Sequence, residues 1–293
     1  MGKCVIALLA AGVVLVAASA NAQSGPVVLA SSVRASHELR SNTIATFTVA
    51  CSRDYVATSG GLVTPRSGVR VLSILPITTR AYRFRIGNAM RDSDRRVTVV
   101  VACRRVAAGK ATFRLRLKPL KTTSVVIPPQ EAATAELVCP SGTIPADGAV
   151  DLDPARRESR GAYRDAAQLS VRSETSTLER LSFSVRNSGT RARPVALHGG
   201  CLTLVRPAGA PAERLHVKVT TFVGVRVQAG EQTLTRRCQR GWFSLSAGYA
   251  LRSPLTTVTG AAAVTGGGRW GIDSDAKAGA TADLQLACGR LAP

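Results

Sequence analysis

Cysteines are the residues of this chain whose spacing most directly indicates chemistry. Cys4 lies in an apolar leader, and the other six are Cys51, Cys103, Cys139, Cys201, Cys238 and Cys288. The gaps between these six are 52, 36, 62, 37 and 50 residues, so long and short gaps alternate. Structural zinc sites use closely spaced pairs such as C-x2-C, which this spacing does not offer. The alternation indicates a repeated unit that holds two cysteines and favours disulfide chemistry.

The segments beside the cysteines repeat as well. After the first cysteine of each pair, the chain reads CSRDYVATSGG, CPSGTIPADGA and CQRGWFSLSAGY. A glycine follows that cysteine by nine or ten residues: Gly60, Gly148 or Gly248. An aromatic residue precedes the second cysteine by 18 or 19 residues: Phe84, Phe183 or Trp270. Four positions after the aromatic residue comes Asn88, Asn187 or Ser274.

This repeat predicts three units with one disulfide in each. The predicted units are residues 23–107, 108–205 and 206–293. The predicted bridges are Cys51–Cys103, Cys139–Cys201 and Cys238–Cys288. In the chain-entropy model, closing loops of this size stabilises each unit by roughly 4 kcal/mol.

Residues 1–22 have the pattern of a cleaved signal peptide. Lys3 precedes an uncharged apolar run over residues 4–18, and Ala20-Asn21-Ala22 forms an A-x-A-like cleavage site. The apolar run is shorter than the roughly 20 residues that span a bilayer. We therefore expect a secreted or extracellular protein, loosely associated with the cell envelope at most, with no integral membrane anchor in the mature chain.

Apolar residues alternate with polar ones along several segments, with the period of a β-strand. The segments YRFRI (82–86), FRLRLK (113–118) and LHVKV (215–219) each have one apolar and one polar face. The segment RRVTVVVAC, which ends at Cys103, is continuously apolar and is predicted to be a central strand. One helix is predicted over residues 154–169, where Asp153 is a candidate N-cap and Pro154 occupies the first helical position.

Many short strands with turn signals between them predict an all-β protein. We expect three tandem immunoglobulin-like β-sandwich repeats after the signal peptide, each with one intra-domain disulfide. Aromatic residues make up 4% of the chain, which predicts thin cores of Val, Leu and Ala. In such small domains a disulfide contributes a large share of the stability.

The three units resemble a repeat of uncharacterised secreted proteins of high-GC bacteria. Its pattern is Cys-Pro-x-Gly, a glycine-rich turn, an aromatic strand with Asn, and a Val-rich strand that ends in Cys. The opening motif is complete at Cys139-Pro140-Ser141-Gly142, whereas the first unit has Asp54 in place of the glycine and the third lacks the proline. The piece SVRNSGTRARPVAL is also similar to bacterial immunoglobulin-like modules. Neither resemblance implies an activity or catalytic residues.

The chain carries 39 Lys and Arg residues against 18 Asp and Glu residues, a formal net charge of +21. This charge has two readings: a polyanion partner, or the arginine-rich composition that GC-rich coding sequences produce. Under the first reading, basic rows on solvent-facing strands track the polyanion. The candidate residues are Arg83, Arg85, Arg114, Arg116 and Lys118.

Other candidates for chemistry are weak. His37, His198 and His216 occupy unmatched positions in the repeat, and the chain contains no G-x-S-x-G motif. The carboxylate pairs at 92/94, 151/153 and 273/275 are predicted to be solvated turns.

We therefore expect no catalytic residues, no metal and no cofactor. The leading expectation is a non-enzymatic binding or structural protein, whose partner is an anionic envelope polymer or another surface protein. A polyanion binder is the alternative, and a secreted hydrolase comes third.

Overall fold

A computed structural model of the chain describes residues 27–63, 68–107, 114–120, 123–152, 154, 168–206, 208–209, 214–276 and 279–292. The predicted signal peptide, Phe113 and nearly all of the predicted helix lie outside these residues. Nineteen strands and no helix occur in the described part of the chain, and all the strand pairs are antiparallel. The all-β prediction is confirmed. No helix that could cross a membrane is found in the described ranges.

The first predicted unit contains six strands in two three-stranded sheets. One sheet has the order β1-β6-β3 and the other β2-β5-β4. The strands are β1 (Val27–Leu39), β2 (Ile44–Ala50), β3 (Val56–Leu62), β4 (Val69–Thr78), β5 (Ala81–Asn88) and β6 (Arg95–Ala107). The β6 strand is central in its sheet, as its continuous apolar sequence predicts, and Val97 to Cys103 are buried apart from half-buried Thr98.

The second and third units repeat this order of strands. In the second unit they are β7 (Arg114–Pro119), β8 (Thr123–Ile127), β9 (Ala132–Val138), β10 (Ile144–Asp151), β11 (Leu169–Ser176), β12 (Arg180–Asn187) and β13 (Arg193–Val205). In the third they are β14 (Arg214–Val227), β15 (Gly230–Arg237), β16 (Phe243–Leu251), β17 (Thr256–Val264), β18 (Gly267–Ser274) and β19 (Ala280–Ala292). Strands β7 and β8 both pair with β13. Together they correspond to the single long strand β1 in the first unit and β14 in the third.

The register of the sheets shows that the units are equivalent residue by residue. Phe84, Phe183 and Trp270 each lie on the fifth strand of their unit, opposite Ile74, Glu174 and Ala261 on the fourth. The third strand of every unit carries a β-bulge one residue after the position opposite the second cysteine. Counting from this bulge, the equivalent of Gly60 and Gly148 is Ala247, so the expected match with Gly248 is wrong by one residue.

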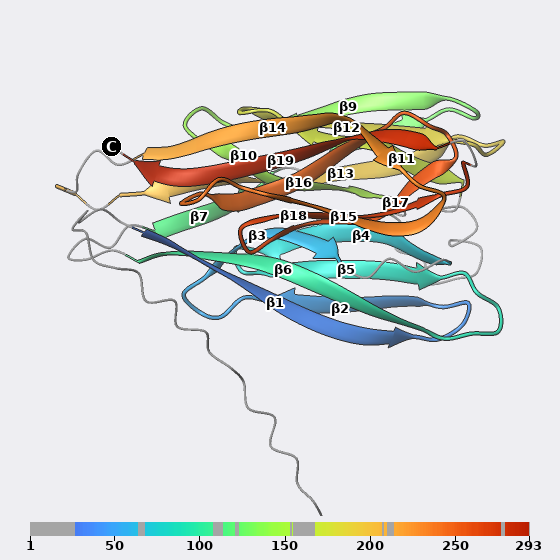
Figure 1. The fold of residues 1–293 in the computed structure, drawn as a ribbon, viewed down its shortest axis with the longest axis horizontal. Coiled ribbons are helices and arrows are strands. Elements are labelled where there is room, and N and C mark those ends of the chain that lie inside the picture. The colour runs from blue at the N-terminus through green and yellow to red at the C-terminus, as the bar shows by residue number, and fades with distance from the viewer. Residues whose placement is uncertain are drawn as a thin grey trace, which may run out of the picture.

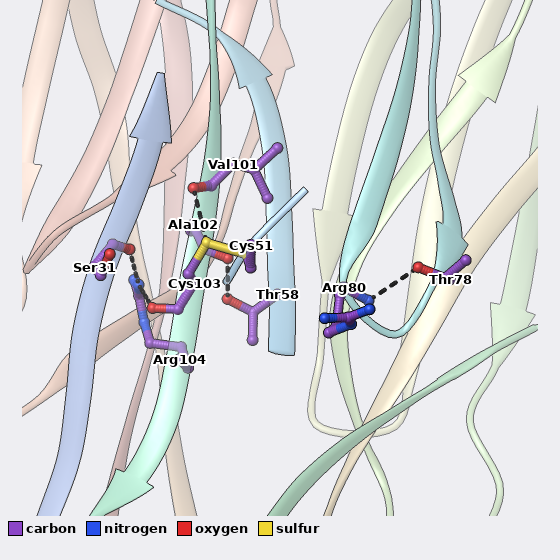
Figure 2. Close-up of a disulfide and its surroundings, with 9 residues drawn as sticks. All are labelled: Ser31, Cys51, Thr58, Thr78, Arg80, Val101, Ala102, Cys103 and Arg104. Atoms are coloured by element: carbon purple, nitrogen blue, oxygen red, sulfur yellow. Dashed lines mark hydrogen bonds between the residues drawn. A yellow bond between two sulfur atoms is a disulfide. The ribbon is translucent and has the colours of Figure 1, made fainter. Parts of the chain in front are cut away.

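Each unit has the disulfide that the repeat predicts. The Cys51–Cys103, Cys139–Cys201 and Cys238–Cys288 bridges have Cα–Cα distances of 5.8, 5.7 and 5.9 Å. The first cysteine follows the second strand and the other lies in the last strand, so each bridge joins the two sheets of its unit (Figure 2 shows the first). Residues of both sheets in each unit form its apolar core.

Each unit contacts both others through the edges of its sheets, so the contacts close into a ring. In Figure 1, strands β1, β2, β5 and β6 of the first unit lie on one side of the molecule, and strands β9, β12, β14 and β19 of the other two units lie on the opposite side. In the first seam, β10 of the second unit packs beside β4 of the first, and Leu152 N donates to Leu72 O over 2.9 Å. In the second seam, β16 pairs with β11, which joins two units in the six-stranded sheet β14-β19-β16-β11-β12-β9. In the third seam, β17 of the third unit packs against β3 of the first. The repeats are therefore joined into one body.

One end of the space between the units is filled by a shared apolar core. Buried residues of the second and third units form this central core: Leu115, Leu117, Ala146, Leu202, Phe243, Leu245 and Ala287. Half-buried residues of β1, β3 and β6 pack against it from the first unit. One sheet of each unit contributes its outer face to this core. An isolated sandwich would expose that face to water, whereas here it is buried.

A buried arginine joins the first and third units beside this core. Arg104 follows Cys103 on β6 and has no exposed surface. Its guanidinium donates to Ser31 O at 3.1 Å, to Cys103 O at 2.9 Å and to Ser244 O at 2.8 Å (Figure 2 shows the first two). Burial lowers the pKa of Arg104 to about 10, so the side chain stays charged at neutral pH. Its charge is solvated by carbonyl oxygens of two units.

Candidate functional site

A cavity of about 420 Å³ lies where the three seams approach one another. Most of its lining comes from the third and fourth strands of every unit, namely β3 and β4, β10 and β11, and β16 and β17. The volume is within the range of small-molecule sites, which is roughly 300–1,000 Å³. Because all three units contribute to its wall, the cavity exists only in the assembled ring.

The first seam differs from the other two in its sequence, and both of its strands line the cavity. In the second and third seams, Gly248 and Gly61 occupy equivalent positions, where a Cβ atom would collide with the carbonyl oxygen of Glu174 or Ala261. The first seam has Ala149 at this position. The strands of the first seam therefore cannot approach each other in the same way.

A second difference at the first seam explains the placement of Asp147. Ser59 and Ser246, at the equivalent positions of the other units, bond to Ala263 N over 3.3 Å and to the Ser176 hydroxyl over 3.5 Å. The residue that corresponds to Ala263 and Ser176 in the first unit is Pro76, which has neither an N–H group nor a hydroxyl group. Asp147 instead accepts a hydrogen bond from Gly60 N over 2.9 Å.

The carboxyl groups of Asp147 and Glu174 share the cavity. Burial raises the pKa of Asp147 to about 7, although hydrogen bonds from Gly60 and Ser59 oppose this shift. Burial, and then the nearby charge of Asp147, raise the pKa of Glu174 well above its usual range. The Glu174 carboxyl group makes no hydrogen bond or ion pair with any residue in the described ranges. The cavity therefore contains a half-buried carboxyl group with no partner among the described residues.

Hydroxyl groups without partners surround the two carboxyl groups. Thr259 is 8% exposed and lines the cavity, yet its Oγ1 atom has no hydrogen-bond partner among the described residues. Tyr249, 6% exposed, also lines it, and burial followed by the charge of Glu174 raises the pKa of its phenol. Buried polar groups normally have partners. The side chains of the cavity thus have unused hydrogen-bonding capacity.

The arginines near the cavity have protein acceptors. Arg70, which lines the cavity, donates to the Leu169 carbonyl across the first seam. Arg172 donates to Thr256 O at 3.0 Å and to the Ser253 carbonyl across the second seam. Neither arginine is within ion-pair distance of Asp147 or Glu174 among the described contacts. These arginines join units and do not neutralise the carboxyl pair.

The cavity has a polar mouth and a buried floor. Ser188 and Thr257 are exposed at its rim, and Gln168 is half-buried there. Asp147 and Thr259 are buried deeper, and the side walls are apolar residues such as Val71 and Val171. A ligand that enters would contact the water-exposed polar groups first and the buried Asp147 carboxyl group last.

A basic groove of about 750 Å³ lies at the other end, between β6 and β7. Its lining includes Arg53, Arg80, Arg105 and Arg114, with Asp54 as its acidic residue. Arg105 is 3.9 Å from Asp54 and lies over the ring of Tyr55 at 5.2 Å. Sequence reasoning found Arg114 and missed the other three arginines: Arg53 and Arg105 each follow a cysteine by two residues, and Arg80 lies in the turn between β4 and β5, so none belongs to an alternating pattern.

The predicted basic rows have mixed outcomes. Arg114, Arg116 and Lys118 are exposed along β7, as expected. Arg83 is half-buried, and Arg85 is 2% exposed, so the prediction that Arg85 lines a solvent face is wrong. Arg85 lies on the central strand of its sheet, with Thr46 and Ser73 paired on its two sides. The structure does not bring the two rows together in one groove.

The remaining candidates are dispersed. His37 stacks on Phe47 with ring centroids 3.7 Å apart, His198 is half-buried on β13 and His216 is exposed on β14. Asp151 is 2% exposed within β10, so it is not in a solvated turn, and Asp153 lies outside the described residues. The described residues contain no cluster of three or more potential metal ligands.

Comparison with known proteins gives no relative: no family model matches the chain, and no curated protein matches it.

Proposed function

We propose that this chain is a secreted, non-enzymatic binding protein of the bacterial cell envelope or extracellular space, and that the central cavity is its binding site. The observation that carries the proposal is the buried hydroxyl of Thr259, which has no partner among the described residues, beside the carboxyl groups of Asp147 and Glu174 inside a cavity of ligand size. A buried polar group without a partner destabilises a fold, so its presence in a cavity is typical of a site that is completed by a ligand.

The covalent framework supports an extracellular compartment. Three disulfides, one in each unit, are stable in an oxidising environment and rare in reducing ones. The apolar leader with its A-x-A-like cleavage site favours export as well.

The absence of a nucleophile with a base favours binding over catalysis. The described residues that line the cavity include no histidine and no cysteine. Its serines, Ser170 and Ser188, thus have no histidine among these lining residues to activate them. The carboxyl pair is the feature of the cavity that a hydrolase could use.

The proposal is tested on protein recovered from culture supernatant. Native mass spectrometry of the purified chain is expected to show a small molecule that leaves on unfolding. Thr257→Trp, at the exposed rim, is expected to reduce the bound fraction at least tenfold, while Thr134→Trp, on the outer strand β9, leaves it unchanged. Absence of any bound molecule, together with no thermal shift in a metabolite library, would overturn the binding function. Chemical conversion of the bound molecule would overturn its non-enzymatic character.

The basic groove supports a second candidate, polyanion binding at the other end of the molecule. Arg53, Arg80 and Arg114 are exposed around one groove, and phosphate or sulfate groups release counterions when arginines contact them. The triple change of these residues to alanine is expected to lower the salt concentration that elutes the protein from heparin. A matched triple change of Arg96, Arg191 and Arg226, which are exposed on three different units, removes the same charge elsewhere. Equal effects of both triples would mean that total charge, not the groove, governs retention.

A further inference from the structure

We propose that the central cavity binds a small organic cation, namely a protonated amine on a compact apolar body. This inference rests on the proposed binding function and assigns the class of ligand. It follows from the charge, the hydrogen-bonding groups and the walls of the cavity.

The charge of the cavity contrasts with that of the chain. The sequence carries 39 basic residues against 18 acidic ones, yet the two carboxyl groups of Asp147 and Glu174 converge here without an arginine or lysine partner in the described ranges. If the side chains in this cavity only reflected the composition of the chain, basic residues would be expected there more often than acidic ones. The acids come from two strands of the second unit and have no equivalents in the other units, where Ser59, Ser246, Ile74 and Ala261 occupy the matching positions.

The hydrogen-bonding groups match an ammonium group. An ammonium donates three hydrogen bonds and accepts none. Glu174 supplies free carboxyl oxygens, and the Tyr249 and Thr259 hydroxyl oxygens are acceptors without partners in the described part of the chain.

The walls favour an organic cation over a metal ion. Val69, Val71, Ile74, Val171 and Val258 line the same cavity and offer no oxygen ligands. Calcium takes six to eight oxygen ligands, whereas the described residues provide no cluster of three or more metal-ligating side chains. Apolar side chains instead stabilise a hydrocarbon body by roughly 25 cal/mol per Å² that is removed from water.

Binding should depend on pH, because the carboxyl groups must ionise to pair with a cation. The groups that face the pair are Tyr82, which interacts with Asp147, Tyr249, which interacts with Glu174, and Arg70, which lines the cavity; Arg172 lies behind Tyr249. Burial holds the pKa of both acids above its usual range. When binding of a cation releases one proton, its affinity rises about tenfold for each unit by which the pH is raised, as long as the pH is below the pKa of the free site. Affinity should therefore rise from pH 6 to pH 8.

The test uses isothermal titration calorimetry of the full secreted chain with cyclohexylamine at pH 6 and pH 8. Cyclohexanol is the neutral control of the same shape, and calcium chloride is the metal control. We expect cyclohexylamine to bind at least tenfold more tightly at pH 8 than at pH 6, with no detectable binding of cyclohexanol or calcium.

Glu174→Gln is expected to weaken amine binding at least tenfold, and Glu179→Gln, an exposed carboxyl on the same unit, is expected to change nothing. Thermal melts of both variants show whether each is folded. Equal binding of cyclohexanol and cyclohexylamine, preference for calcium, or unchanged binding by folded Glu174→Gln would each overturn the cation assignment. These results would leave a binding cavity in place, whereas a cavity that takes no small molecule at all would overturn the proposed function itself.

Discussion

The two ends of the space between the units contrast sharply, although the same three repeats build both. At one end, apolar residues such as Phe243 and Leu245 fill the space, and the charge of Arg104 is fully hydrogen-bonded. At the other end, the ring encloses a cavity with a free carboxyl group and hydroxyl groups without partners. The first end is built for stability, and the second retains polar groups that reduce it. Such a difference is typical of a scaffold that supports a site.

The contrast arises at equivalent positions of the repeat. The residue after the second cysteine of each unit is Arg104, Leu202 or Gly289. The residue opposite the repeated aromatic side chain is Ile74, Glu174 or Ala261. Three identical copies would place three identical side chains around the centre. Divergence at these inward-facing positions therefore creates one asymmetric site from three similar folds.

Leu245→Ala is the change with the largest expected effect, because it opens a void in the central core. Leu245 has no exposed surface, and loss of a buried leucine side chain costs about 2–5 kcal/mol. Urea unfolding followed by tryptophan fluorescence measures the loss. Leu255→Ala, at a position that is 56% exposed, is the control and should change the free energy of unfolding by less than about 0.5 kcal/mol. Similar losses in both variants would mean that the filled end is not a core.

The cavity end should make the protein less stable as the pH rises. The folded-state pKa of Asp147 is raised to about 7, so folding favours the protonated carboxyl and its contribution is lost as the pH rises through that value. Between pH 5 and pH 7, the expected loss is about 1.4 kcal/mol per pH unit for this one proton. Unfolding free energies at several pH values measure it. Asp147→Asn should flatten the profile, and an unchanged slope in this variant would refute the assignment.

Arg104→Met tests the arginine at the filled end. The variant keeps an unbranched side chain of similar reach but leaves carbonyl oxygens of Ser31 and Ser244 without their donors, at an expected cost of about 2 kcal/mol. Arg105→Met, at the neighbouring half-buried position, is the matched control. A gain in stability would show that the desolvation of the guanidinium outweighs its hydrogen bonds.

Thr259→Val has the smallest expected effect, and its sign is opposite. The hydroxyl of Thr259 is buried without a partner, so replacing it with a methyl group should stabilise the ligand-free protein by up to about 1 kcal/mol. The same change should weaken amine binding. Thermal melts with and without cyclohexylamine measure both effects. A large loss of stability would indicate that the hydroxyl already has a partner and that the cavity is a structural feature.

Several features of the fold could be predicted because they depend on local pattern. The alternation in residues 114–118 correctly separates buried Leu115 and Leu117 from their basic neighbours. The aromatic and Asn positions of the repeat fall in one structural register. The prediction fails for Arg85, since period two identifies two faces of a strand without showing whether both are covered.

The sequence by itself indicated the all-β class and the pairing of the six cysteines, because strand periodicity and the repeated spacing of the cysteines can be read along the chain. The closed ring and its cavity were decided by tertiary structure alone. Asp147 and Glu174 lie on different strands, and Tyr249 belongs to another unit, so no spacing in the chain relates them. Their meeting depends on which edges of the sheets pack together. That choice rests on small differences such as Ala149 and Pro76 at the first seam, whose effect appears only when two units are in contact.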